Sequence, residues 1–258
     1  MRRILATDLD GTIVFERAVP AATRAALERW RAAGNMLVVA TGKSIFATDD
    51  VLAPSHVAFD YCVCYTGAVV TDGAYDVVDA TFLPLDLVRE VYAYLRDLPH
   101  VATYATPLDH DYVLSDNADR VDSILAKFTP LAEADFAAHR FVGVPMLVTD
   151  DAMREQVAAH LVATWGDRLE VHRNQHFLDI VPPGSDKGLG LRRLLEHAFG
   201  GEDVDLWTLG DSWNDIGMHR IADHPVCFTY SPPEVKAVCE REVGLAEELI
   251  DDLLAGNA

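Results

Sequence analysis

The stretch ILATDLDGTIV, residues 4–14, runs from an apolar segment into two acids, Asp8 and Asp10, which are followed by Gly11 and Thr12. Side chains two residues apart on an extended segment point to the same side, so we expect the two carboxylates to lie close together. Neighbouring carboxylates repel each other, and each raises the pKa of the other. An apolar strand that ends in such a pair therefore indicates a site that needs positive charge from elsewhere.

The composition is that of a globular protein, with 258 residues of which 50% are hydrophobic and 24% charged. The net charge of −20 argues against nucleic acid or an anionic membrane as a partner, because those partners need clustered Lys and Arg. We find neither a membrane-spanning apolar run nor a signal peptide pattern, and we expect a cytoplasmic protein. Cys62 and Cys64 form a C-x-C without a second pair, which indicates buried thiols rather than a zinc site.

Strand and helix patterns alternate in the first and last thirds of the chain. Apolar strand-like runs lie at residues 4–7, 36–40 and 204–210, and the segment between the first two has the spacing of an amphipathic helix. Fully apolar strands are typical of a buried parallel sheet, and strand–helix–strand alternation predicts helices on both of its faces. The predicted fold class is α/β, with a doubly wound parallel sheet.

The middle of the chain is organised differently, because a helical stripe followed by two strand-like runs occurs there twice. A further helix, at about residues 119–127, and a strand are expected between the two blocks. The segment is too long for a loop, since loops beyond roughly 12–15 residues are uncommon in compact domains. We predict that residues 83–181 form an inserted α/β domain, and that residues 1–82 and 182–258 together build the core.

Three polar motifs follow three of the predicted parallel strands. They are DLDGT at 8–12, TG at 41–42 and GDSWND at 210–215, while Lys187 begins a helix just after the insertion. Ligands of open parallel sheets bind at the carboxyl ends of the strands. Carboxylates, hydroxyls and a lysine at one edge suit a divalent cation with a phosphoryl group, because Mg²⁺ prefers a few carboxylates plus phosphate oxygens and water. Its charge would also relieve the repulsion between the acids.

The order and spacing of D-x-D-G-T, T-G, an isolated Lys and G-D-x-x-N-D resemble those of the haloacid dehalogenase superfamily of phosphotransferases. The insertion and the segment FLDIVPPGSDKG, residues 177–188, resemble the α/β cap of its Cof-like subgroup and the exit from that cap. The resemblance implies a Rossmann-like core and a cap that selects the substrate, with hinges near residues 82–84 and 181–184. It further implies a Mg²⁺-dependent phosphatase, monomeric or homodimeric, that acts on small phosphorylated metabolites such as sugar phosphates.

The same resemblance implies a role for each motif residue. Asp8 is the expected nucleophile, which becomes an aspartyl phosphate, and Asp10 is the expected acid and base. Thr41 and Lys187 are expected to hold the phosphoryl group. Further contacts with the phosphate or the substrate are expected from Thr12, Gly42, Asn214, Asn174 and His176, of which the last two could equally be ordinary polar residues at a sheet edge. The expected metal ligands are Asp8, Asp211, the main-chain oxygen of Asp10, and Asp215, which could instead orient another ligand.

Some positions depart from the family's pattern or leave its meaning open. The usual T-G-R is here Thr41-Gly42-Lys43, and we interpret Lys43 as a solvated charge at the start of a helix. The usual N-G-A is here Thr66-Gly67-Ala68, which puts a polar contact from position 66 in doubt. Trp213, inside the last motif, is expected to pack against its neighbours rather than to cover the site.

Two other functions fit the same motifs. A phosphomutase would form the same aspartyl phosphate but return the phosphoryl group to a sugar, so that it would yield an isomer instead of free phosphate. A phosphoacceptor signalling domain also gathers acids, a Thr and a Lys around Mg²⁺, although it needs neither Asp10 as an acid and base nor a cap.

Overall fold

The computed structural model describes residues 2–118, 128–174, 176–200 and 202–256. Its contacts divide the chain into two compact units. The core unit comprises Met1–Asp79 and Asp186–Ala258, and the inserted unit comprises Ala80–Ser185. None of the helices within the described ranges is long and apolar enough to cross a membrane.

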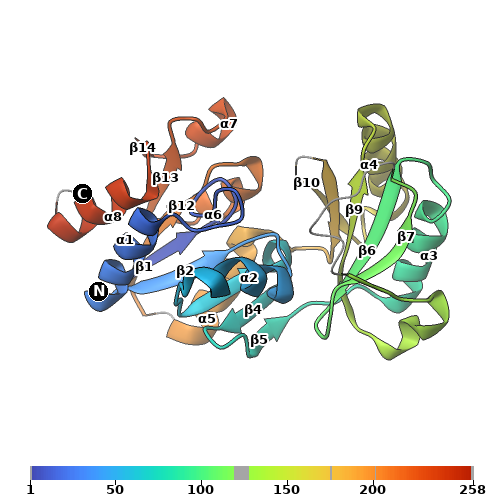
Figure 1. The fold of residues 1–258 in the computed structure, drawn as a ribbon, viewed down its shortest axis with the longest axis horizontal. Helices are drawn as coiled ribbons and strands as arrows, with labels where there is room; N and C mark the ends of the chain where they lie inside the picture. Colours follow the sequence, from blue (N-terminus) through green and yellow to red (C-terminus); the bar gives the residue numbers. More distant parts are fainter. Residues whose placement is uncertain (1, 119–127, 175, 201, 257–258) are drawn as a thin grey trace. The chain divides into compact units, whose positions relative to one another are not determined.

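The core unit is built on an eight-stranded sheet with the order β14-β13-β12-β1-β2-β3-β4-β5 (Figure 1). The strands from β14 to β3 are parallel, and β4 runs antiparallel to β3. The parallel sheet confirms the predicted α/β class, whereas the analysis of the sequence did not anticipate β4, β5 or β14. The strands are β1 (Arg2–Thr7), β2 (Met36–Ala40), β3 (Tyr61–Cys64), β4 (Val69–Asp72), β5 (Val77–Ala80), β12 (Val204–Leu209), β13 (His224–Phe228) and β14 (Arg241–Val243).

Helices cover the core sheet on both faces. One face packs on α5 and α6, where Ile4 and Ala6 of β1 join Leu191 and Leu194 in a buried cluster. Outside this cluster, α1 packs on β2 and on α8 (Figure 1). The helices are α1 (Ala21–Ala32), α2 (Ile45–Leu52), α5 (Lys187–Phe199), α6 (Ile216–His219), α7 (Pro233–Lys236) and α8 (Ala246–Ala255), with short 3₁₀ turns at η1 (Ala53–Ser55), η2 (Tyr65–Gly67) and η5 (Trp213–Asp215).

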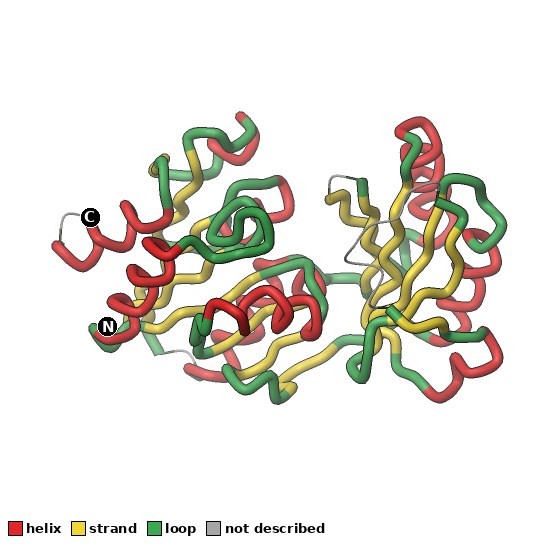
Figure 2. Tube along the Cα trace, viewed as in Figure 1, coloured by secondary structure: helices red, strands yellow, loops and turns green. Residues whose placement is uncertain are grey.

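The inserted unit has a six-stranded sheet of its own, with the order β10-β11-β9-β6-β7-β8. Both of its long helices lie on one side of that sheet (Figure 2), where Val88, Val91, Val157 and Leu161 belong to one buried cluster. The helix expected at 119–127 lies outside the described residues. The elements are α3 (Leu85–Leu95), β6 (Val101–Pro107), β7 (Tyr112–Asp116), β8 (Thr129–Pro130), η4 (Glu133–Ala138), β9 (Phe141–Val148), α4 (Asp151–Trp165), β10 (Glu170–Asn174) and β11 (Phe177–Val181).

The register of the core sheet brings the three polar motifs together. Thr7, the last residue of β1, is paired with Leu209 at the end of β12 and with Val39 near the end of β2. The next residues of these three neighbouring strands therefore leave the sheet at one edge. This is the edge at which open parallel sheets bind their ligands.

Candidate active site

A buried ammonium group joins the first and last motifs. Lys187, at the start of α5, places its Nζ 2.7 Å from Oδ1 of Asp8 and 2.7 Å from Oδ1 of Asp215. Lys187 and Asp215 are fully buried, and Asp8 is 5% exposed. Burial lowers the pKa of Lys187, but the attraction of Asp215 and Asp8 outweighs burial and raises this pKa above its ordinary value. The lysine is therefore a fixed positive charge at the centre of the site.

Asp215 organises the loop that carries it. Its Oδ2 accepts hydrogen bonds from the main-chain N–H groups of Asp211, at 3.0 Å, and Ser212, at 2.9 Å. Its Oδ1 accepts the hydrogen bond from Lys187. Because both oxygens of Asp215 are bound by protein donors, the contacts favour the orienting role among the two that the sequence left open.

Asp211 lies against the loop that follows β1. The hydroxyl of Thr12 donates to Oδ1 of Asp211 at 3.1 Å, so this threonine contacts one of the acids. Gly11 has a φ of +76°, and a Cβ there would lie 2.8 Å from Oδ2 of Asp211. Glycine is thus required both by the backbone conformation and by the closeness of the acid. The hydroxyl of Tyr230 donates to the main-chain oxygen of Gly11 at 2.5 Å and fixes this turn.

The acids outnumber the cations at this edge. Asp8, Asp211 and Asp215 each offer a carboxylate oxygen, and these oxygens lie within 4.8 Å of one another. Burial raises the pKa of Asp8 to about 8, although Lys187 lowers it, and burial raises the pKa of Asp211 to about 6. Three ionised carboxylates and one ammonium leave two negative charges uncompensated. This all-oxygen cluster fits a hard divalent cation, which takes oxygen ligands.

Asp10 does not join these acids. Its Oδ2 lies 2.7 Å from Nζ of Lys43, and its side chain is 52% exposed. Asp10 accordingly contributes least among the named causes of the raised pKa of Asp8. The interpretation of Lys43 as a solvated charge is wrong, because its side chain is 19% exposed and ion-paired with Asp10.

The loop after β2 is held by the loop after β3. The main-chain N–H of Thr41 donates to the main-chain oxygen of Val63 at 2.8 Å. The main-chain N–H of Thr66 donates to the main-chain oxygen of Thr41 at 3.1 Å. Tyr65 and Thr66 both have positive φ angles, of 50° and 52°, which is uncommon for residues other than glycine. Thr41 is buried, and Gly42 follows it at the edge where the acids lie. The structure therefore keeps the T-G motif beside DLDGT, as the parallel order predicts.

The remaining motif residues have mixed surroundings. Asn214 keeps its Oδ1 buried without a hydrogen bond to any residue that the structure describes. Trp213 is 59% exposed, so the expectation that it packs against its neighbours is wrong. In the inserted unit, His176 is exposed, with Nδ1 3.4 Å from Nη1 of the buried Arg154. Asn174 ends β10 opposite Phe177, and its side chain lies outside the described part.

Reasoning from the sequence missed three residues around the site. It gave Lys43 no partner, and it did not single out Tyr230 or His219. His219 is buried with Nδ1 2.9 Å from the hydroxyl of Thr208, and burial lowers its pKa to about 4, so it is a neutral packing group. Tyr230 follows β13 by two residues, and this position after a parallel strand is a signal that the sequence does carry.

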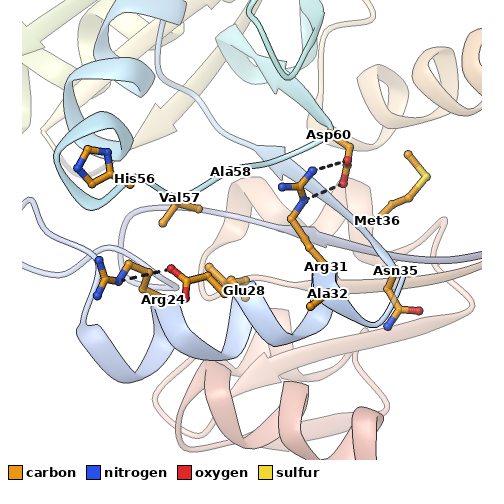
Figure 3. Close-up of a pocket in the computed structure, with 12 residues that line it drawn as sticks. Arg24, Glu28, Arg31, Ala32, Asn35, Met36, His56, Val57, Ala58 and Asp60 are labelled. Carbon is orange, nitrogen blue, oxygen red and sulfur yellow. Dashed lines mark hydrogen bonds and ion pairs between the residues drawn. The ribbon is translucent and has the colours of Figure 1, made fainter.

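A cavity of about 540 Å³ lies at the other end of the strands (Figure 3). Its lining includes Met36, which begins β2, and Asp60, which directly precedes β3. The charged groups drawn there are paired with one another, since Arg31 binds Asp60 at 2.7 Å and Arg24 lies 3.9 Å from Glu28. The cavity is thus separate from the cluster of acids.

Comparison with known proteins gives three kinds of match. The family of haloacid dehalogenase-like hydrolases matches residues 5–248. A 5-amino-6-(5-phospho-D-ribitylamino)uracil phosphatase, YwtE of Bacillus subtilis, is 23% identical over 99% of both chains. The chloroplastic endoribonuclease YBEY of Arabidopsis thaliana is 28% identical over 90% of this chain, which spans 42% of that protein's length. The solved structure of the subclass IIB sugar phosphatase BT4131 has the same fold, with a TM-score of 0.78 at 19% identity over 99% of each chain.

The buried ion pairs predict a specific pattern of stability. Lys187→Met leaves Asp8 and Asp215 without their shared countercharge, and we expect the free energy of unfolding to fall by about 3–5 kcal/mol. The double variant Lys187→Met/Asp215→Asn lacks one of these unpaired charges and should be more stable than Lys187→Met. Urea unfolding followed by circular dichroism measures both. Lys236→Met, which removes a surface pair with Glu242, is the control and should cost less than about 1 kcal/mol. A double variant as unstable as the single one would contradict the coupling.

The raised pKa values predict how Mg²⁺ and pH act on stability. Without metal, folded Asp8 and Asp211 hold protons that the unfolded chain releases near the ordinary pKa of 3.8. Folding therefore takes up protons, and stability falls as the pH rises through the interval between about 4 and 8. Because Mg²⁺ replaces those protons, it should raise the Tm more at about pH 8 than at about pH 5. Thermal melts in EDTA and in excess Mg²⁺ test this, and Asp211→Asn should lose most of the rise. Equal shifts at both pH values would refute the expectation.

Proposed function

The chain belongs to the haloacid dehalogenase-like hydrolases, and on this premise we propose that it is a phosphatase that hydrolyses phosphomonoesters through an aspartyl phosphate on Asp8. The observation that carries the proposal is the contact of Lys187 with Asp8 at the carboxyl end of β1. Lys187 holds Oδ1 of Asp8 and leaves its second oxygen to attack phosphorus. The same ammonium stands where negative charge gathers during phosphoryl transfer, and such charge is stabilised by fixed cations.

The proposed reaction has two steps. First, Oδ2 of Asp8 forms a bond to phosphorus while the bond from phosphorus to the ester oxygen breaks, and Asp10 gives its proton to the leaving alkoxide. Second, Asp10 takes a proton from a water molecule whose oxygen bonds to phosphorus, and the bond to Asp8 breaks to release phosphate. The half-exposed position of Asp10 supports both duties, because it lets this carboxylate reach the leaving group and then water.

The phosphoryl oxygens need donors of their own during both steps. We assign them to the hydroxyl of Thr41, the N–H of Gly42 and the side chain of Asn214, all at the same edge of the core sheet as Asp8. Thr12 serves the site through its hydrogen bond to Asp211. Mg²⁺ held by Asp8, Asp211 and the main-chain oxygen of Asp10, with Asp215 as an orienting acid, would supply the positive charge that keeps the cluster ionised.

We propose small phosphorylated metabolites, sugar phosphates among them, as the substrates. Two similar proteins support this proposal by the substrates in their names, since one is a 5-amino-6-(5-phospho-D-ribitylamino)uracil phosphatase and the other is a sugar phosphatase. We further propose that residues 83–181 act as a cap that selects the substrate and closes over it about hinges near 82–84 and 181–184. Within that unit, Asn174 and His176 are the proposed specificity residues, and the neighbouring Arg154 adds a buried positive charge.

Phosphate release across a panel of sugar, nucleotide and cofactor phosphates tests the reaction. Asp8→Asn removes the nucleophilic oxygen and should reduce turnover of every ester to the background level. Asp49→Asn, a change of an exposed acid on α2, is the matched control and should leave the rates unchanged. Wild-type rates in Asp8→Asn would refute the covalent mechanism. Isomerised product without free phosphate would indicate a phosphomutase, and slow self-phosphorylation without turnover would indicate a phosphoacceptor domain.

The specificity role of His176 has a separate test. His176→Ala should change kcat/KM by different factors for different members of the same panel, because a group that binds the leaving part of the ester distinguishes among esters. His197→Ala, on the exposed surface of α5, is the control and should change none of them. Identical relative rates in wild type and His176→Ala would remove this residue from the proposal.

A further inference from the structure

We propose that Lys43 is a positioning residue that holds the carboxylate of Asp10 in place for its proton transfers. This inference rests on the proposed function, in which Asp10 is the acid and base. Among the residues that the structure describes, Lys43 is the one that bonds the Asp10 carboxylate, at 2.7 Å between Nζ and Oδ2.

The main chain of Lys43 is fixed on both sides. Its N–H donates to the hydroxyl of Thr41 at 3.2 Å, and its oxygen accepts from the N–H of Tyr65 at 2.9 Å. The next residue, Ser44, caps α2 by accepting from the N–H of Ala47 at 3.1 Å. A lysine at the free start of a helix would have a mobile main chain and a solvated head group. Here these hydrogen bonds fix the main chain from which the Lys43 side chain extends.

Asp10, by contrast, lies in a turn that leaves its side chain half exposed. The N–H of Gly11 donates to Val14 at 3.0 Å, which closes the turn behind Asp10 without touching its carboxylate. A half-exposed carboxylate with no partner samples several rotamers, and proton transfer requires one of them. A single ion pair from an anchored lysine selects the rotamer before the ester arrives.

The ion pair between Lys43 and Asp10 is expected to affect the reaction rate more than the stability of the fold. A partly exposed ion pair contributes at most about 1 kcal/mol to stability. General acid–base catalysis typically raises a reaction rate by roughly 10²–10⁴-fold. A misplaced acid can lose a large part of this rate increase. Lys43 should therefore matter for the step in which a proton moves and hardly at all for the Tm.

The identity of the leaving group separates this role from direct binding of phosphate. An alkyl phosphate releases a strongly basic alkoxide and needs a proton from Asp10, whereas p-nitrophenyl phosphate releases a stable phenolate and needs hardly any protonation. We expect Lys43→Met to lower kcat/KM about tenfold or more for the best alkyl phosphate of the panel. The value for p-nitrophenyl phosphate should change less than about twofold. Because kcat/KM covers the steps up to formation of the aspartyl phosphate, slow hydrolysis of that intermediate does not blur the comparison.

Three further variants complete the experiment. Lys43→Arg keeps the charge near Asp10 and should restore most of the alkyl phosphate activity, Lys43→Gln should behave like Lys43→Met, and Asp10→Asn should show the same selectivity more strongly. Equal losses for both esters would assign Lys43 to phosphate binding and overturn the inference, as would unchanged rates for both. If wild type hydrolyses neither ester, or if Asp10→Asn keeps wild-type rates, the proposed function itself fails instead.

Discussion

The contact of one buried ammonium with two buried carboxylates is the constraint on which the arrangement of the core depends. Lys187 reaches Asp8 and Asp215 because α5 approaches the end of β3 very closely, and a Cβ on Gly190 would lie 2.6 Å from Cγ1 of Val63. Charges buried this deeply are tolerated where they are paired and hydrogen-bonded. The start of α5, the end of β1 and the loop after β12 must therefore meet with little freedom, which is the rigidity that an in-line phosphoryl transfer needs.

The same contact leaves the site incomplete on electrostatic grounds. One ammonium cannot neutralise Asp8, Asp211 and Asp215. Burial, and after it the charge of Asp215, raises the pKa of Asp8 to about 8 although Lys187 lowers it. An acid that is protonated near neutral pH is a poor nucleophile. The negative charges of the core thus repel one another, and a divalent cation would relieve this repulsion. The same cluster of acids would therefore bind the cation and lower the stability of the folded protein when the cation is absent.

Much of the core was predictable, because parallel strands carry their information locally. The apolar runs that end in polar motifs predict that DLDGT, TG and GDSWND lie at one edge of the sheet. Two of the missed strands lack that signal, since β5 has no buried residue and β14 has only three residues. Lys43 and Trp213 were misjudged for a related reason. Their exposure is decided by segments distant in sequence, and nothing in the neighbouring residues reports that Asp10 lies within reach of Lys43.

Asp8 and Asp10 do not lie side by side, because the rule that residues two apart point to the same side holds only in an extended segment. Asp8 directly follows the last residue of β1, but beyond it the oxygen of Leu9 accepts from the N–H groups of Thr12, Ile13 and Val14, so the chain turns instead of continuing as a strand. Asp8 is consequently buried on Lys187, while Asp10 is half exposed on Lys43. Two identical side chains thus acquire opposite surroundings, one fixed and dry, the other accessible to water. The proposed covalent mechanism needs both, because the group that bonds to phosphorus must stay still and the group that transfers the proton must meet the leaving alkoxide and then a water molecule.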